Sequence, residues 1–245
     1  MRTCPVCASH FPNFLPLPIS FFEIFHRLNV PYSLDDFETL NIAQYSCPVC
    51  QASDRDRLYA LYIHSQFVRT RRSKLRVLDI APASGLSRIL RSLPEVAYRS
   101  ADLYSALADE RVDVMDMRCY PDQSFDFVVC SHVLEHVKDD SVAIAEIYRV
   151  LAPDGCAILM VPILTTATMI DEDVELMDVN ERWRRFGQDD HVRMYTQSSF
   201  LARLERGGFS VVQFGVVDFG AEAFRRHGIT PGSILYIGKK ELTRE

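Results

Sequence analysis

The sequence lacks an apolar run long enough to cross a membrane, and it lacks a positive net charge. Its longest apolar run, CAILMVPIL at residues 156–164, falls far short of the roughly 20 residues that a transmembrane helix needs. The opening residues, MRTCPVC, do not have the composition of a secretory signal. A net charge of −6 argues against binding to nucleic acid phosphates. We therefore expect a cytoplasmic protein with a small-molecule partner, no membrane contact and no nucleic acid.

Glycine is scarce at the turn where nucleotide-binding folds usually have several. The stretch KLRVLDIAPASGLSRIL, residues 74–90, is predicted to be a buried strand that turns into a helix. Gly85 is the only glycine in this turn, and Ala81 and Ala83 stand where further glycines are expected. In dinucleotide sites those glycines let a charged pyrophosphate approach the backbone. Their absence weakens the prediction of an NAD-dependent oxidoreductase.

Four of the seven cysteines form two copies of the tetrapeptide CPVC. A Cys-x-x-Cys turn presents two thiolates to one ion, and two such turns complete a tetrahedral zinc site. We predict a structural Zn²⁺ held by Cys4, Cys7, Cys47 and Cys50. The alternative, a redox-active dithiol, needs a strand before the motif and a helix at it, and neither is evident in the sequence. The Pro- and Phe-rich segment between the two pairs either packs on the main domain or forms a lid or wall of a substrate site.

Strand and helix patterns alternate after the second cysteine pair. Continuous apolar strands that alternate with helices are typical of a mostly parallel sheet covered on both faces. The predicted fold class is α/β, with a doubly wound, seven-stranded, Rossmann-like sheet and a small zinc-ribbon-like segment before it. We expect the zinc segment at residues 1–53 and the α/β domain at 54–245, with a substrate-side insertion at about 164–195. The expected strands are at residues 75–81, 97–105, 111–117, 124–133, 156–163, 210–219 and 233–240, and the expected helices at 54–68, 85–93, 141–155 and 196–209.

Polar residues stand at four of the predicted strand ends, where ligands bind in such sheets. A carboxylate at the end of the second strand suits the hydroxyls of a ribose. A single aspartate there is otherwise a turn former or a helix cap. The candidates are Asp79 with the turn to Gly85, then Asp102, Asp116 with Met117, and Ser131 with His132.

The ordered set VLDIAPASG, YRSADL, VDVMDMRCYPDQSFDFVVCSHVLEHV and EIYRVLAPDGCAILMVPI resembles class I S-adenosylmethionine-dependent methyltransferases. With its cysteine pairs the chain is similar to a methyltransferase type 11-like group that has an N-terminal zinc-binding segment. The resemblance implies S-adenosyl-L-methionine as cofactor. Alanine in the turn is then tolerable, because this cofactor has no phosphate. The implied cofactor residues are Asp79, Ala81, Ala83 and Gly85 at the methionine part, Asp102 and Leu103 at the ribose, Asp116 and Met117 at the adenine, and Ser131 and His132 beside the sulfonium.

The resemblance also implies in-line methyl transfer to an oxygen or nitrogen of a small-molecule or sugar-like acceptor. His132 is our first candidate for the base, with substrate orientation or cofactor packing as its alternatives. His136 is expected to pack against Glu135 or backbone. In RWRRFGQDDHVRMYT, residues 182–196, the alternating His191, Arg193 and Tyr195 would share one face of an extended segment. We predict catalytic or substrate-binding roles for them, and a solvated polar loop is the alternative.

Other functions remain open from the sequence alone. An rRNA or tRNA methyltransferase with a zinc knuckle is the alternative within the class, and an NAD-dependent oxidoreductase or a binding module without turnover are alternatives outside it. Arg55 and Arg57, at the start of the predicted helix 54–68, would reach the cofactor carboxylate, the zinc segment or surface ion pairs. An exposed Phe-rich face would favour a homodimer.

Overall fold

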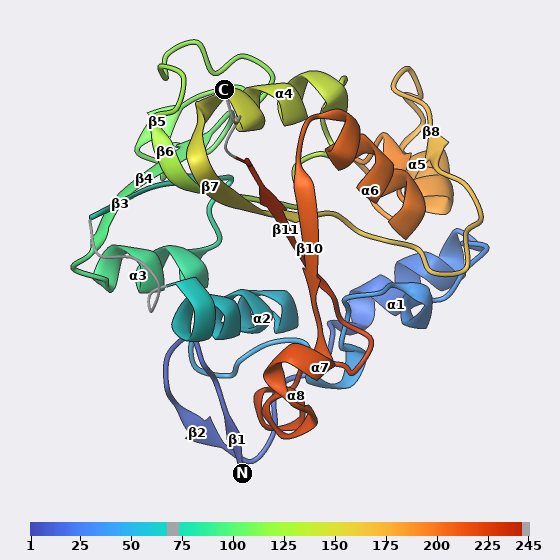
Figure 1. Ribbon diagram of the computed structural model, residues 1–245. Coiled ribbons are helices and arrows are strands. Elements are labelled where there is room, and N and C mark those ends of the chain that lie inside the picture. Colours follow the sequence, from blue (N-terminus) through green and yellow to red (C-terminus); the bar gives the residue numbers. More distant parts are fainter. Residues whose placement is uncertain (68–73, 242–245) are drawn as a thin grey trace.

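A seven-stranded sheet with the order β10-β11-β7-β6-β3-β4-β5 runs through the centre of the computed structural model, which describes residues 1–67 and 74–241 (Figure 1). The strands are β3 (Leu75–Ile80), β4 (Val96–Asp102), β5 (Glu110–Arg111), β6 (Phe125–Ser131), β7 (Leu151–Met160), β10 (Ser210–Phe214) and β11 (Leu235–Lys239). Neighbours from β7 to β5 pair in parallel, and β11 runs antiparallel to both β7 and β10. The predicted fold class is confirmed.

Helices cover both faces of the sheet, which explains why β3, β6 and β7 are apolar along most of their length. Figure 1 shows α2 (Asp54–Tyr62) and α3 (Ser84–Ser92) on one face and α4 (Asp140–Val150) and α6 (Gln197–Arg206) on the other. Helix α2 begins with a capping box between Ser53 and Asp56. It continues as a π-helix over Ile63–Phe67, and residue 68 of the predicted helix lies outside the described residues.

Several predicted boundaries were wrong, among them the following three. The helix expected to end at residue 155 ends at Val150, because residues 152–155 form a bulge in β7 where Asp154 has a left-handed backbone (φ 60°). The strand expected to reach residue 219 ends at Phe214, and Val216–Phe219 forms the short helix α7. The strand expected at 111–117 is limited to Glu110–Arg111, because a turn follows at residues 113–116.

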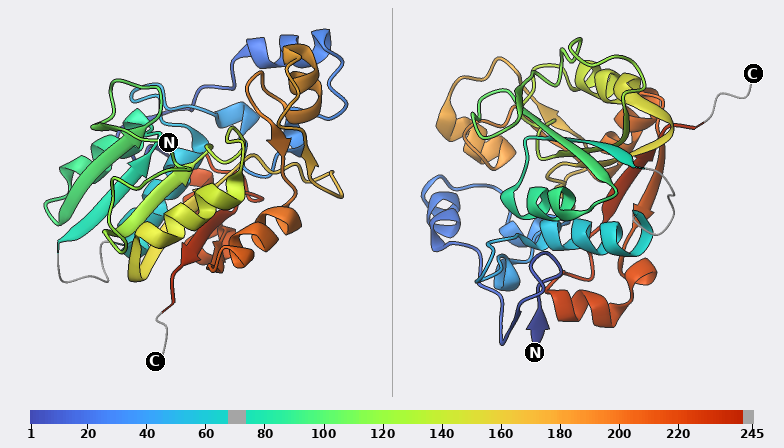
Figure 2. Two further views of the ribbon diagram at one scale, coloured as in Figure 1. Left: turned by 90° about the horizontal axis from the view of Figure 1, so that it is seen from above. Right: turned by 90° about the vertical axis from the view of Figure 1, so that its left-hand side faces the viewer.

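The remaining elements are short and lie mostly in the N-terminal segment and the insertion. They are β1 (Arg2–Thr3), β2 (His10–Phe11), α1 (Ile19–Arg27), the 3₁₀ turns Leu34–Asp36 and Ile42–Gln44, β8 (Asp171–Glu172), α5 (Val179–Phe186), β9 (Arg193–Met194) and α8 (Ala221–His227). Figure 2 shows α1 beside α5. There Trp183 makes edge-on contacts with Phe21 and Phe25, with ring centroids 6.4 Å apart in each pair. The segment thus reaches across to the insertion. Within the described residues, no helix is both long and apolar enough to span a bilayer.

Arg57 joins the N-terminal segment to the α/β domain. Its side chain is fully buried and lies 3.8 Å over the ring of Phe14. Its guanidinium donates to five backbone carbonyls, those of Gln44, Tyr45 (3.0 Å), Ala52 (3.0 Å), His227 (2.7 Å) and Gly228 (2.9 Å). A planar group with five donors satisfies such a set, whereas other side chains do not. Of the roles considered for Arg57, the structure supports contact with the zinc segment.

Candidate active site and cysteine cluster

A cavity of about 380 Å³ opens at the carboxyl ends of β3 and β6. Its wall combines the first turn of α2 with the turn between β3 and α3. Six of the ten residues expected to hold the cofactor line this cavity, namely Asp79, Ala81, Ala83, Gly85, Ser131 and His132. The other four, Asp102, Leu103, Asp116 and Met117, are not among its lining residues. The structure therefore brings the predicted residues at the ends of β3 and β6 together at one cavity. The predicted residues at the end of β4 and after β5 are not part of its lining.

Asp79 ends β3 as a buried carboxylate, with 1% of the residue exposed. The hydroxyls of Tyr98 (2.7 Å) and Ser87 (3.3 Å) donate to its Oδ2. Burial raises the pKa of Asp79 to about 7, and these two hydrogen bonds offset only part of that effect. A cation that enters the cavity would favour the ionised form.

The turn after β3 keeps the backbone shape of a glycine turn without the glycines. Ala81 has a left-handed backbone with φ of 51°, and its N–H donates to the carbonyl of Ala101 at 2.8 Å. Gly85 is needed for a different reason. A Cβ at Gly85 would lie 3.3 Å from the side chains of both Val6 and Ala52, which belong to or follow the cysteine pairs. The single glycine of the turn is thus placed where α3 packs closely against the N-terminal segment.

The two predicted carboxylates at the end of β4 and after β5 have local partners. Asp102 Oδ1 accepts the N–H groups of Tyr104 and Ser105, both at 2.7 Å, and so shapes the loop after β4. Asp116 pairs with Arg118 on the surface at 2.6 Å, and this contact lowers the pKa of Asp116. Their predicted contacts with ribose and adenine stay predictions.

A second cavity, of about 300 Å³, lies between the N-terminal segment and the insertion. One wall is mostly apolar and includes Leu17, Phe21, Phe25, Leu34 and Phe37. The other wall is polar and includes His132, Glu135, His136, Gln188 and His191. The Phe-rich segment between the cysteine pairs therefore forms a wall of this cavity, and its predicted role at a substrate site stays a prediction. Tyr45, Arg55 and His132 line both cavities.

His132 lies where the two cavities meet. It directly follows β6 with a left-handed backbone (φ 57°), which turns its side chain out of the strand path. Its Nε2 is 3.1 Å from Arg55 Nη1, and its Nδ1 is 3.1 Å from Glu135 Oε1. Burial, followed by the positive charge of Arg55, lowers the pKa of His132 to about 4. The imidazole is therefore neutral at pH 7.

Glu135 also lines the second cavity, and the sequence interpretation did not single it out as a site residue. It is 0% exposed, and neither of its oxygens has a hydrogen bond of good geometry within the described part of the chain. Burial opposes its ionisation, but its histidine neighbours, His132 foremost, lower the pKa of Glu135 to about 2. The available signal was an acidic residue four positions after the end of β6, with histidines at −3 and +1, in SHVLEHV.

His136 and His191 border the same cavity. The His136 Nδ1 atom lies 3.2 Å from an Asp190 carboxylate oxygen. Burial works against the charge of His136, but Asp190 outweighs it and raises the pKa of His136. His191 Nδ1 is 2.9 Å from the Phe186 carbonyl, and burial lowers its pKa. His191 lies in the cavity wall, and its predicted role as a base stays a prediction. His136 faces Asp190 as well as Glu135, the partner that was expected.

Arg193 and Tyr195 share a face, as the alternation predicts, but this face points into the protein. Both are buried. The Arg193 guanidinium donates to the carbonyls of Leu134, Val137 and Lys138 and to Glu172. The Tyr195 hydroxyl donates to Asp140 at 2.5 Å. Neither residue is among the lining residues of the two cavities, and the Arg193 guanidinium holds the loop after β6. Their predicted contacts with a substrate stay predictions.

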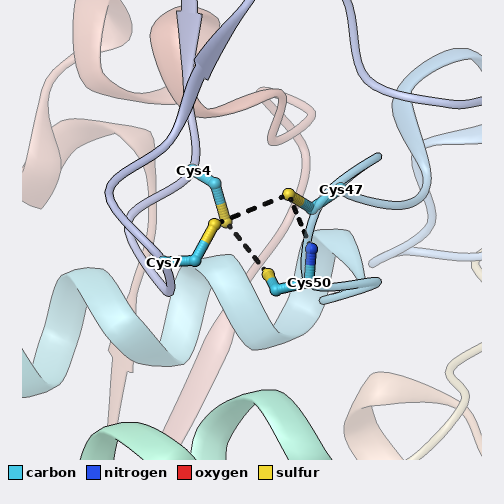
Figure 3. Close-up of side chains that lie close together, drawn as sticks. All are labelled: Cys4, Cys7, Cys47 and Cys50. Carbon is cyan, nitrogen blue, oxygen red and sulfur yellow. Dashed lines mark hydrogen bonds between the residues drawn. The ribbon is translucent and has the colours of Figure 1, made fainter.

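The four cysteines of the CPVC pairs lie together at the N-terminal end of the molecule, and Figure 3 shows their sulfur atoms pointing toward one another. All four atoms lie within 4.8 Å of one another. Sγ of Cys4 is 3.7 Å from that of Cys50, and Sγ of Cys7 is 3.8 Å from that of Cys47. Four sulfurs around Zn²⁺ at about 2.3 Å would be about 3.8 Å apart. The cluster fits a tetrahedral zinc site.

The two CPVC turns have the same backbone structure. The N–H after the second cysteine donates to the carbonyl of the first cysteine, from Ala8 to Cys4 and from Gln51 to Cys47, both at 2.9 Å. Ala8 (φ 58°) and Gln51 (φ 62°) are both left-handed. The N–H groups of Val49 and Cys50 also point at the Cys47 sulfur, at 3.4 and 3.5 Å. Such donors stabilise a thiolate ligand.

Comparisons with known proteins agree with this arrangement. A family model described as a methyltransferase domain matches residues 52–214. The crystal structure of the cyclase SpnF is similar with 16% identity and a TM-score of 0.51, over 96% of this chain and 99% of SpnF. The YcgJ protein of Bacillus subtilis has 19% identity and a TM-score of 0.44, over 71% of this chain and 94% of YcgJ. An S-adenosylmethionine-dependent methyltransferase of Mesorhizobium loti has 17% identity and a TM-score of 0.46, over 68% and 91%. Comparison with curated proteins gives no match.

Proposed function

Because the chain belongs to the class I S-adenosylmethionine-dependent methyltransferase family, we propose that it transfers a methyl group to an oxygen or nitrogen of a small-molecule acceptor. The observation that carries this proposal is the meeting of two cavities, since Tyr45, Arg55 and His132 line both. A donor at the strand ends and an acceptor in the second cavity would face each other there. Holding both reactants in line supplies much of the rate enhancement for such a displacement.

The first cavity has the charges that S-adenosylmethionine requires. Asp79 is a buried carboxylate whose hydrogen-bond donors in the described residues are hydroxyl groups, so it fits the ammonium of the methionine part. Arg55, which lines the same cavity, fits the methionine carboxylate. Bound there, the cofactor supplies an electrophilic methyl group on a sulfonium. Asp102 and Asp116 keep their predicted contacts with the ribose and the adenine within this proposal.

The second cavity suits an acceptor with an apolar part and a polar reacting group. Its apolar wall comes from the N-terminal segment, and its polar wall is formed by histidines and Glu135. A volume of about 300 Å³ fits a small metabolite. The net charge of −6 also disfavours RNA as the acceptor. We therefore keep the RNA methyltransferase only as an alternative outcome of the test below.

His132 is the proposed general base. It is neutral at pH 7 and lies between the cavities. When Arg55, 3.1 Å from its Nε2, binds the cofactor carboxylate instead, Nε2 would be free to take the proton of an acceptor hydroxyl or ammonium. The Glu135 carboxylate, 3.1 Å from its Nδ1, would stabilise the imidazolium that forms. As the proton leaves the acceptor, its lone pair bonds to the methyl carbon, and sulfur keeps the electrons of the broken carbon–sulfur bond.

The cysteine cluster is proposed to hold a structural Zn²⁺. With four protein ligands, such an ion has no open position for catalysis. Its contribution would be to fix the ends of the segment that forms the apolar wall, which lowers the entropy cost of ordering that segment.

Calorimetric titration with S-adenosylmethionine, S-adenosylhomocysteine and NADH tests the proposed function. We expect micromolar binding of the first two and none of NADH. His132→Asn should keep cofactor binding while methyl transfer falls by roughly 10²- to 10⁴-fold. Binding of NADH alone would overturn the proposal. Transfer of label to RNA, with a steep salt dependence, would replace the small-molecule acceptor by the alternative.

A further inference from the structure

Three residues at the polar end of the acceptor cavity form a second cluster of metal-ligating groups, separate from the cysteines. One ligand atom each of Glu135, His136 and His191 lies within 4.8 Å of the others. All three residues line the cavity of about 300 Å³. Two imidazoles with one carboxylate are a ligand set for divalent transition ions that leaves coordination positions open.

Glu135 is a fully buried carboxylate whose oxygens have no hydrogen bond within the described residues. His132 Nδ1 approaches Oε1 at 3.1 Å and His136 Nε2 approaches it at 4.0 Å, but neither contact has hydrogen-bond geometry. A buried carboxylate without donors costs several kcal/mol, by an order-of-magnitude estimate. An ion bound to Glu135 would remove that cost.

The two histidines are oriented as metal ligands usually are. Nδ1 of His136 is held by Asp190 at 3.2 Å, and Nδ1 of His191 is held by the Phe186 carbonyl at 2.9 Å. These contacts fix the tautomer and leave Nε2 as the free nitrogen of each ring. The free Nε2 of His136 lies 4.0 Å from Glu135 Oε1. The rings are 4.6 Å apart at an angle of 82°, which allows both to approach one point.

We propose that Glu135, His136 and His191 bind a divalent transition-metal ion at the polar end of the acceptor cavity. The open positions of this ion face the cavity and suit an acceptor with two adjacent oxygens, such as a vicinal diol. The metal site stands on the cluster alone, and the choice of acceptor rests on the proposed function. One oxygen bound to the ion loses its proton to His132 more readily, because a divalent ion lowers the pKa of a coordinated hydroxyl. The oxygen then bonds to the methyl carbon while sulfur keeps the electron pair of the broken bond.

Mn²⁺ is the probe for the site, because it prefers oxygen and imidazole ligands to the thiolates of the cysteine cluster. The full-length protein, with its zinc content measured, is titrated with Mn²⁺ at pH 8 and followed by electron paramagnetic resonance. We expect one Mn²⁺ per chain. Glu135→Gln and His191→Gln should each weaken binding at least tenfold, and Asp190→Asn, which acts through His136, should weaken it roughly tenfold or more. Glu175→Gln, an exposed acidic residue of the same insertion, should leave binding unchanged.

The experiment distinguishes an error in the proposed metal site from an error in the proposed diol acceptor. Absence of Mn²⁺ binding in the wild type, or unchanged binding in a folded Glu135→Gln variant, overturns the site. Catechol should perturb the spectrum of bound Mn²⁺ and phenol should not. If catechol and phenol both perturb the spectrum, or if neither does, while Mn²⁺ binds, the diol acceptor is overturned and the metal site is retained. Calorimetry with S-adenosylmethionine on the same samples tests the proposed function independently.

Discussion

Arg55 Nη1 lies 3.1 Å from His132 Nε2, at the junction of the two cavities. The first residue lies in the first turn of α2 and the second follows β6, so this contact ties the N-terminal side of the domain to the centre of the sheet. The positive charge of Arg55 has two effects at this junction. It faces the place proposed for the cofactor carboxylate, and it helps to lower the pKa of His132, which keeps the ring neutral.

Arg55→Gln should weaken S-adenosylmethionine binding. A hydrogen bond to a charged group contributes about 1.5–3 kcal/mol, which corresponds to roughly 10- to 150-fold in affinity. Calorimetry on the variant measures this loss. Arg99→Gln, which removes an exposed arginine that pairs with Glu110, is the matched control and should bind as the wild type does. Equal affinities for the wild type and Arg55→Gln would remove Arg55 from the cofactor site.

The cysteine cluster should hold one Zn²⁺ that a thiol-modifying reagent releases. Cys47→Ser should release none and should melt at a lower temperature, because the ends of the N-terminal segment are no longer joined. Cys119→Ser is the control, because Cys119 is exposed and lies outside the cluster. Zinc release measured with a chromogenic chelator decides the matter, and an unchanged yield from Cys47→Ser would contradict the assignment.

Arg57→Met should destabilise the protein by at least about 3 kcal/mol, because it leaves several buried carbonyls without donors. Arg57→Lys should recover little, since an ammonium does not reproduce the planar set of five donors. Urea denaturation gives both values. Arg76→Met, which removes an exposed ion pair with Asp126, should change stability by about 1 kcal/mol or less. A similarly small effect at Arg57 would show that the segment is held by other contacts.

Asp79 should make the free protein less stable as the pH rises. Its folded pKa, about 7, lies above the value in an unfolded chain, so the folded state binds the proton more tightly. Its contribution is therefore fully present below about pH 4 and is lost as the pH rises through 7, by up to about 4 kcal/mol. Asp79→Asn should match the wild type near pH 4 and exceed it in stability at pH 8. Denaturation of both proteins across this range tests the sign, and a difference that does not depend on pH would contradict it.

The sheet was predictable because its information is local. Each buried strand is a mostly apolar run with a polar residue at its end, as at Asp79 near the end of β3 and His132 directly after β6. The exception is the bulge in β7, where Pro153 and Gly155 look like a helix stop although the partner strand β6 determines the outcome. A local pattern cannot report a partner that lies elsewhere in the chain.

The site was less predictable than the sheet. Alternating residues of an extended segment are expected to share a face, but the sequence does not show whether that face points to the surface or into the protein. His191, Arg193 and Tyr195 were expected on one surface, but the Arg193 guanidinium points inward and donates to the carbonyls after β6. Glu135 was missed because the sequence does not show that its carboxylate is buried without a hydrogen bond. That property depends on how the chain packs around it. The role of Gly85 likewise depends on contact with Val6, far away in the sequence.

The most direct test of the account blocks the acceptor cavity without touching the cofactor cavity. Leu40 lines only the former and is partly buried, so Leu40→Trp fills space there, while Leu107→Trp on the exposed surface is its control. Both variants and the wild type are incubated with S-adenosylmethionine labelled in the methyl group and with separate small-molecule and RNA fractions of a cell extract. We predict label in the small-molecule fraction for the wild type and Leu107→Trp, and its loss in Leu40→Trp with cofactor affinity unchanged. Label in RNA, or equal transfer by all three proteins, would contradict the account.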